Sequence, residues 1–291
     1  VGNVQSHLND SPHALAKLHT EGTLPHEGIY DQSVEAEKDL DLLRDAALAW
    51  RATSDERYLK LVDRLLYAWV TTYQPTFNPV DETHFDGLIL AYDMTASALP
   101  VKTRNAAMAF LTKLANGYIG QIDAQPRPLK GSFRNNWQSH RVKLIAMAAF
   151  TLDNRKMINA AQRLYVEHIG DNIAPDGSTV DFAERDALHY VTYDLQPLVT
   201  AALAARRHNR NWLPEKAANG ASLNAALDWL KPRQVLDVKG DWAERAPGVR
   251  PGGWAFQYDN AYYPDLDDTA VVVMAMDSQR RRGALTDDYR E

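Results

Sequence analysis

Apolar residues recur every three or four positions along most of this chain, and this is the repeat of an amphipathic α-helix. The segment 34–53 shows the pattern clearly, with Leu40, Leu43 and Trp50 on one face. A second stripe of the same kind begins almost at once, after Ser54. Because so short a link leaves little room, the two helices are expected to pack antiparallel as a hairpin.

The same periodicity predicts several further helices. They are expected at about 82–98, 101–123, 137–151, 157–169, 183–207 and 215–230. Strand signals are rare, and Gly177–Phe182 is the best short candidate for one. The pattern therefore predicts an all-α fold of antiparallel helical hairpins, although periodicity alone does not separate a toroid from a solenoid or a bundle.

Composition excludes several classes of protein. The 291 residues include no cysteine, which excludes a disulfide scaffold, a cysteine-ligated metal and a cysteine nucleophile. Acidic residues outnumber basic ones by 38 to 32, and the net charge of −6 argues against a nucleic-acid partner. A polyanionic substrate remains compatible, because a local basic cleft is enough to bind it.

No membrane span or export signal is expected from the sequence. A span needs roughly 20 apolar residues in a row, and the longest apolar runs, at 144–150 and 270–276, are much shorter. The first ten residues are polar and contain no apolar signal core.

Two segments each bring several polar side chains close together. Asn136 and His140 are four residues apart in "FRNNWQSHR", so they share a helix face. Arg185, His189 and Tyr193 are also spaced by four in "ERDALHYVTYDLQPL", and Tyr190 lies beside them. The two helices thus offer neutral donors, imidazoles, phenols and a cation.

This set of side chains suits β-elimination of a uronic-acid polymer. The reaction needs donors and a cation that neutralise the sugar carboxylate and stabilise the enolate that forms. It also needs a base for the C5 proton and an acid for the departing O4 oxygen, and it requires no metal or cofactor. Structural roles compete with this interpretation, because tyrosines at helical spacing often only pack and Asn135 can simply cap a helix.

Residues 20–210 resemble the alginate-lyase superfamily of helical-toroid polysaccharide lyases. The matching segments are "LPHEGIYDQS", "NPVDETHFDGLILAYDM", "FRNNWQSHR" and "ERDALHYVTYDLQPL". The resemblance implies an (α/α) toroid, complete or incomplete, that acts in the periplasm or outside the cell on an anionic polysaccharide such as alginate or polyglucuronate. It implies neither a cofactor nor a nucleic-acid partner.

The resemblance also implies roles for individual residues. Asn136 would neutralise the carboxylate, His140 would be base or neutraliser, Arg185 the cation, and Tyr190 or Tyr193 base and acid. Substrate contacts would come from His26, Tyr30, Asn135, Trp137 and His189, and the loop that contains Glu82 would lie near another contact point. Trp137 stands where the best-known alginate lyases have histidine, and the spacing from arginine to tyrosine differs by about one residue, so the choice of tyrosine stays open.

The C-terminal segment, from about residue 222, resembles a different family, the squalene–hopene cyclases. Residues 226–242 resemble the QW repeat of that family, and "DLDDTA" resembles its acid motif. By this resemblance Asp267, or its neighbours Asp265 and Asp268, would be the Brønsted acid, although acids at a helix start also act as caps. We therefore divide the chain into a lyase-like part, 1–221, and a cyclase-like part, 222–291. The alternatives to a lyase are a cyclase-type isomerase fragment and a catalytically inactive helical chimera.

Overall fold

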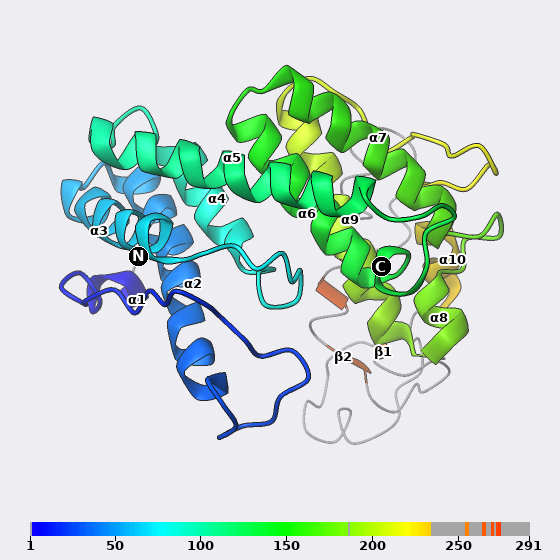
Figure 1. Ribbon diagram of the computed structural model, residues 1–291, viewed down its shortest axis with the longest axis horizontal. Helices are drawn as coiled ribbons and strands as arrows, with labels where there is room; N and C mark the ends of the chain where they lie inside the picture. Colours follow the sequence, from blue (N-terminus) through cyan, green and yellow to red (C-terminus); the bar gives the residue numbers. More distant parts are fainter. Residues whose placement is uncertain are drawn as a thin grey trace, which may run out of the picture. The chain divides into compact units, whose positions relative to one another are not determined.

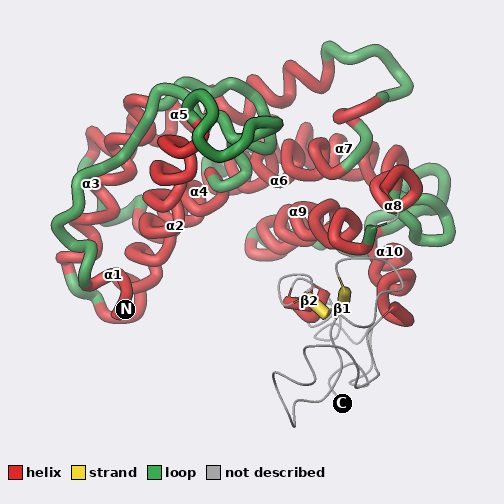
Figure 2. Tube along the Cα trace, turned by 90° about the horizontal axis from the view of Figure 1, so that it is seen from below, coloured by secondary structure: helices red, strands yellow, loops and turns green. Residues whose placement is uncertain are grey.

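Helices make up nearly all of the regular structure in the described part of the chain (Figures 1 and 2). The computed structural model describes residues 2–185, 187–233, 254–255, 264–265, 269–270 and 272–274. The α-helices are α1 (Gly2–Gln5), α2 (Tyr30–Thr53), α3 (Glu56–Thr72), α4 (Phe85–Thr95), α5 (Val101–Asp123), α6 (Asn136–Thr151), α7 (Arg155–Asn172), α8 (Val180–Arg185), α9 (Leu188–Arg207) and α10 (Leu223–Leu230). Two short 3-10 helices lie at Gly131–Phe133 and Lys231–Arg233, and strands β1 (Trp254–Ala255) and β2 (Pro264–Asp265) pair antiparallel.

The chain forms two compact units that alternate along the sequence. The first contains Val1–Gln125 and Lys143–Ala161, and the second contains Pro126–Val142 and Gln162–Glu291. Helices α6 and α7 therefore each contribute residues to both units. The expected boundary at residues 221 and 222 falls inside the second unit, and that division stays a prediction. Within the described residues, no helix is both long enough and apolar enough to cross a membrane.

The first unit contains the predicted helical hairpin, α2 and α3. Ser54 has a left-handed backbone with φ of 57° and ends α2. The next residue, Asp55, starts α3 by accepting a hydrogen bond from the backbone N–H of Arg57 at 2.9 Å, as an N-cap carboxylate does. The link therefore ends one helix and caps the next within two residues, which confirms the expected hairpin.

Aromatic side chains fill the core of the first unit. Trp69 and Tyr73 meet Phe85, with ring centres 5.8 and 4.7 Å from that of Phe85, and Phe110 lies 5.7 Å from it. Gly87 allows α4 to approach α2 closely, because a Cβ at this position would lie 2.7 Å from the carbonyl oxygen of Leu40. Burial of large apolar surface of this kind is the main source of stability.

A buried carboxylate organises the loop before α4. Glu82 has no exposed surface. It accepts five hydrogen bonds, from the hydroxyls of Tyr73 and Tyr118, the backbone N–H groups of Thr76 and Phe77, and the Thr76 hydroxyl. Burial raises the pKa of this carboxyl, while the hydrogen bonds from Tyr118, Thr76 and Tyr73 oppose the rise. Glu82 therefore holds the loop together and does not present its carboxylate at the surface.

The second unit departs from the sequence predictions in three places. The strand expected at Gly177–Phe182 is absent, because Thr179 accepts a hydrogen bond from the N–H of Phe182 and so starts α8. The single helix expected over 183–207 is two helices, since Ala187 has extended backbone angles and separates α8 from α9. The helix expected from residue 215 begins only at Leu223, where Ser222 is its N-cap.

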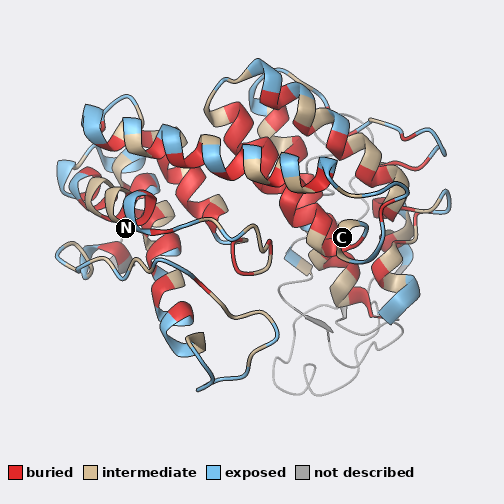
Figure 3. Cartoon of the chain, in the orientation of Figure 1, coloured by how far each residue is buried: buried red, intermediate tan, exposed pale blue. Residues whose placement is uncertain are grey.

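Helix α6 differs from the other helices in its burial. Every residue from 138 to 150 is buried, whereas α5 alternates buried and exposed positions along its length (Figure 3). A helix that is buried on all sides belongs to a core. Its few polar side chains must therefore find partners inside the protein.

Candidate functional site

Histidine and tyrosine rings from α6 and α9 meet in the second unit. Asn136 is the first residue of α6, and His140 lies one turn further on. The His140 and Tyr193 ring centres are 4.4 Å apart. On the same helix as Tyr193, the imidazole of His189 lies nearly parallel to the phenol ring, with 6.2 Å between their centres. Tyr193 is therefore flanked by two imidazoles.

Arginine and the second tyrosine extend this group. Arg185 is the last residue of α8, and its guanidinium carbon lies 4.1 Å from the centre of the Tyr190 ring. Tyr190 in turn approaches His189, with ring centres 5.8 Å apart. Although Ala187 separates α8 from α9, the chain still brings Arg185 next to Tyr190, its predicted neighbour.

An aspartate that the sequence analysis did not single out completes the arrangement. Asp181 on α8 is fully buried. Its carboxylate accepts hydrogen bonds from the backbone N–H of Asn136 at 2.7 Å and from the Asn136 side-chain amide at 2.6 Å. It also forms an ion pair with Nε of Arg185 at 3.5 Å. We call the following residues the α6–α9 cluster: Asn136, His140, Asp181, Arg185, His189, Tyr190 and Tyr193.

The cluster has an inner and an outer part. Asn136 and His140 are each 2% exposed, whereas His189, Tyr190 and Tyr193 are half-buried. The Arg185 side chain is 34% exposed. A ligand that approaches from solvent therefore meets the arginine and the tyrosines first, and the amide and one imidazole lie beneath them.

The environment of Tyr193 keeps its phenol protonated. Burial raises the pKa of Tyr193 above its usual value, and the neighbouring Tyr190 raises it further. A neutral phenol donates a hydrogen bond and can give up its proton to a developing oxyanion. The structure thus favours Tyr193 as an acid.

A second buried network lies near the cluster. The hydroxyl of Ser139 donates to Asp194 and lies 2.7 Å from Nε2 of His168. The side-chain amide of Asn172 donates to the other carboxylate oxygen of Asp194 at 2.6 Å. Burial raises the pKa of Asp194 to about 8, with a further contribution from the charge of Asp181.

This network does not have the order of a hydrolase triad. In such a triad the imidazole lies between the hydroxyl and the carboxylate, whereas here the Ser139 hydroxyl lies between His168 and Asp194. Ser139 is also completely buried, and burial lowers the pKa of His168 to about 3, so that its ring stays neutral. We therefore assign these residues a structural role.

Other predicted contact residues have identifiable local roles. The side-chain oxygen of Asn135 accepts from the N–H of Trp137 at 3.1 Å and so caps α6, and Trp137 itself is half-buried. His26 and Tyr30 belong to the first unit. The side chain of His26 is 88% exposed and pairs with Asp31 at 2.7 Å.

The predicted acid motif falls mostly outside the described residues. Asp265 lies in β2 and pairs with Trp254 of β1, while Asp267 and Asp268 are not among the residues that the structure describes. Within the described residues, no group of three or more histidine or acidic side chains is placed to hold a metal ion.

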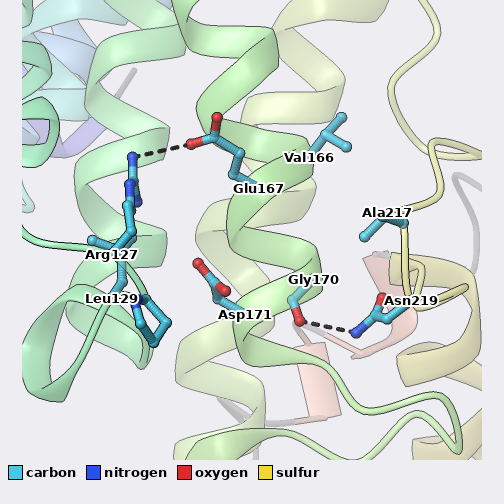
Figure 4. A pocket seen from close by; sticks show the side chains of 10 residues that line it. Arg127, Leu129, Val166, Glu167, Gly170, Asp171, Ala217 and Asn219 are labelled. Carbon is cyan, nitrogen blue, oxygen red and sulfur yellow. Dashed lines mark hydrogen bonds and ion pairs between the residues drawn. The ribbon is translucent and has the colours of Figure 1, made fainter.

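A pocket of about 530 Å³ lies elsewhere in the second unit (Figure 4). Glu167 and Asp171 of α7 line it together with Arg127, which pairs with Glu167 at 3.2 Å. Leu129 and Ala217 add apolar surface. Because two carboxylates face one guanidinium here, the pocket disfavours a polyanion, and it contains none of the cluster residues.

Part of the chain is similar to squalene–hopene cyclases. The family model of the squalene-hopene cyclase C-terminal domain matches residues 196–289. The squalene–hopene cyclase of Zymomonas mobilis is 67% identical over 67 residues, which are 23% of this chain and 10% of that protein. That of Bradyrhizobium diazoefficiens is 73% identical over 60 residues, which are 21% and 9% of the two chains. The chain thus spans about a tenth of the length of these curated relatives.

Solved alginate lyase structures share the fold over almost the whole chain. A tetrasaccharide complex of a variant of alginate lyase A1-III has a TM-score of 0.69 at 18% identity, covering 96% of this chain and 78% of that one. The structure of A1-III from a Sphingomonas species gives 0.67 at 17% identity, with 96% and 80% covered. An alginate lyase from Bacteroides ovatus gives 0.69 at 13% identity, with 97% and 84% covered. This likeness confirms the predicted fold class, an all-α fold of the helical-toroid type.

The sequence match to the lyases covers most of the chain. The family model described as alginate lyase matches residues 3–239, and these include every member of the α6–α9 cluster. The match overlaps the cyclase match over residues 196–239. The chain belongs to the alginate lyase family.

Proposed function

We propose that the protein is a polysaccharide lyase that cleaves a uronic-acid polymer, alginate or polyglucuronate, by β-elimination. The observation that carries the proposal is the α6–α9 cluster, which joins Asn136, His140, Arg185 and two tyrosines in a member of the alginate lyase family. The tetrasaccharide complex of a structural neighbour supports a saccharide chain as the ligand. The family's usual site of action supports a periplasmic or secreted location as part of the proposal.

The first task of the site is to neutralise the sugar carboxylate. Arg185 is the cation of the cluster, its side chain is 34% exposed, and its Nε lies 3.5 Å from the Asp181 carboxylate. Asn136 donates one amide proton to Asp181, and a carboxamide has a second proton to donate. Hydrogen bonds and positive charge at the carboxylate stabilise the enolate that forms when the C5 proton leaves.

The second task is to move two protons. The C5 proton passes to an imidazole, its electron pair forms the C4=C5 double bond, and the C4–O4 bond breaks. The departing O4 oxygen takes the phenolic proton of Tyr193, whose raised pKa keeps that proton available at neutral pH. The imidazole is His140 or His189, which flank Tyr193 on two sides.

An ultraviolet assay of polyuronate cleavage tests the proposal. Polymannuronate, polyguluronate and polyglucuronate are supplied in turn, and the conjugated C4=C5 bond is followed by its absorbance. Tyr193→Phe is expected to lower kcat by about 100-fold or more, the usual contribution of a general acid. Tyr190→Phe is the matched control, because phenylalanine keeps the ring that stacks on Arg185 and should leave most of the activity.

Two further variants separate the imidazoles. His140→Gln and His189→Gln are compared on the polymer that the protein cleaves, and the base is the residue whose replacement removes the fall of kcat/KM at low pH. No absorbance change on any polymer, from a protein shown to be folded, would overturn the proposal and favour an inactive helical chimera. Cyclase activity is not part of the proposal, because the match covers only about 10% of the cyclase chain.

A further inference from the structure

The buried carboxylate of Asp181 contacts both side chains to which the proposed function assigns the sugar carboxylate. Its two oxygens accept from the backbone N–H and the side-chain amide of Asn136 at 2.7 and 2.6 Å. The same residue is 3.5 Å from Nε of Arg185. We propose that Asp181 is a positioning residue, which fixes the Asn136 amide and the Arg185 guanidinium in the orientation that receives the substrate carboxylate; this role rests on the proposed function.

Asp181 sets the orientation of the Asn136 amide because a carboxylate only accepts hydrogen bonds. The amide must turn its nitrogen, and not its oxygen, toward Asp181. With one amide proton held in this way, the direction of the second proton is fixed as well. A side chain that both donates and accepts would allow the amide to bind in either of two orientations.

The contact with Arg185 fixes the cation in the same way. Nε lies 3.5 Å from the Asp181 carboxylate, and the guanidinium carbon lies 4.1 Å from the centre of the Tyr190 ring. The side chain of Arg185 is one-third exposed, whereas Asp181 has no exposed surface. Asp181 therefore acts on the exposed guanidinium from within the protein and does not compete for a ligand at the surface.

The neighbouring acid shows why this role falls to Asp181. Burial raises the pKa of both Asp181 and Asp194, and the charge of Asp181 raises that of Asp194 further, to about 8, so Asp194 is the one that keeps its proton. Asp194 contacts only the neutral side chains of Ser139 and Asn172 among its described hydrogen-bond partners. The two Asn136 donors and the Arg185 charge oppose the effect of burial on the pKa of Asp181 and favour its ionised form. Asp181 is therefore the anion of the pair.

A capping role alone would also place an acid at this position, since Asp181 meets the N-terminus of α6. Capping and positioning differ in what a variant does. Loss of a cap lowers stability and leaves the turnover of each folded molecule unchanged. Loss of positioning lowers kcat in a protein that is still folded.

The test compares Asp181→Asn with Asp194→Asn, two nearly isosteric changes at buried acids of the same unit. Asp181→Asn is expected to lower kcat by up to about 100-fold, the order of loss that a misplaced binding group causes. KM should stay the same or fall, because the neutral variant leaves the positive charge of Arg185 less compensated. Asp194→Asn should keep kcat and KM, because its partners lie outside the cluster.

A second measurement follows the contact between Asp181 and Asn136 without an activity assay. In the unmodified protein the Asn136 side-chain amide should give NMR resonances that exchange slowly with water, identified by their absence from Asn136→Ala. In Asp181→Asn these resonances should shift and exchange faster. Equal kcat per folded molecule in Asp181→Asn and the unmodified protein, or equal losses in both aspartate variants, would overturn the positioning role. Failure of the unmodified protein to cleave or bind any polyuronate would instead refute the proposed function, and this role with it.

Discussion

Replacing Glu82 by leucine is expected to destabilise the protein by about 2–6 kcal/mol. The phenol groups of Tyr73 and Tyr118, which are 1% and 0% exposed, both donate to this carboxylate. Removing the acceptor from a buried donor costs about 1–3 kcal/mol, and two donors are affected. The N–H groups of Thr76 and Phe77 are not counted, because those residues are exposed or half-buried and water can replace the carboxylate there. Since a domain is stable by only about 5–15 kcal/mol, the loss is a large fraction of the total.

Glutamine at the same position is the matched control. Its carbonyl oxygen accepts from the loop as the carboxylate does, and its amide nitrogen can donate to a phenol oxygen. Because burial already raises the pKa of Glu82, a neutral side chain is not expected to be costly. Glu82→Gln should therefore cost less than about 1.5 kcal/mol, the net value of one ordinary hydrogen bond.

Urea unfolding followed by circular dichroism measures both variants. Combining Glu82→Leu with Tyr73→Phe removes the donor together with its acceptor, so this double variant should recover about 1–3 kcal/mol relative to Glu82→Leu alone. Equal stabilities of the leucine and glutamine variants, or no recovery in the double variant, would refute the reasoning.

Three further predictions concern stability. Burial raises the pKa of Asp194 from 3.8 to about 8, so its protonated form stabilises the fold, and this stabilisation is lost as pH rises through that range. Asp194→Asn should therefore reduce the fall of the urea unfolding midpoint between these pH values. An equally steep fall of the midpoint with pH would contradict the raised pKa. Burial lowers the pKa of His168 from 6.5 to about 3, so the neutral imidazole stabilises the fold, and this stabilisation is lost as pH falls through that range. His168→Gln should remove this loss. An equally steep fall of the urea midpoint in the variant would contradict a neutral, buried imidazole. Gly117→Ala would place a Cβ 2.0 Å from the ring of Phe77 and should cost about 1–3 kcal/mol in the same assay, and an unchanged stability would contradict this close packing.

Long amphipathic helices could be predicted because their signals are local. The stripe of α3 and the capping carboxylate of Asp55 lie within one segment of sequence, so no distant partner is needed to recognise them. The break between α8 and α9 was missed because Arg185, His189 and Tyr193 fit one helical repeat. That spacing says nothing about the extended backbone of Ala187 between them.

The inner part of the candidate site could not be predicted from local pattern. Asp181 meets Asn136 across 45 residues of sequence, and Ser139 meets Asp194 across 55. In the sequence each of these residues looks like an ordinary polar position near a helix start or on a helix face. Their burial, which gives them their roles, follows from tertiary packing. The outer residues were found because arginine, histidine and tyrosine stand close together in one segment.

Mass spectrometry of the cleavage products tests the central claim most directly. β-Elimination breaks the chain without adding water, so the product masses should sum to that of the oligouronate substrate, and one product should contain a double bond. We expect this result for the unmodified protein, and we expect Tyr193→Phe to form the unsaturated products about 100-fold or more slowly. Products that together contain one additional water, or unsaturated products that form in Tyr193→Phe as fast as in the unmodified protein, would contradict the proposed reaction.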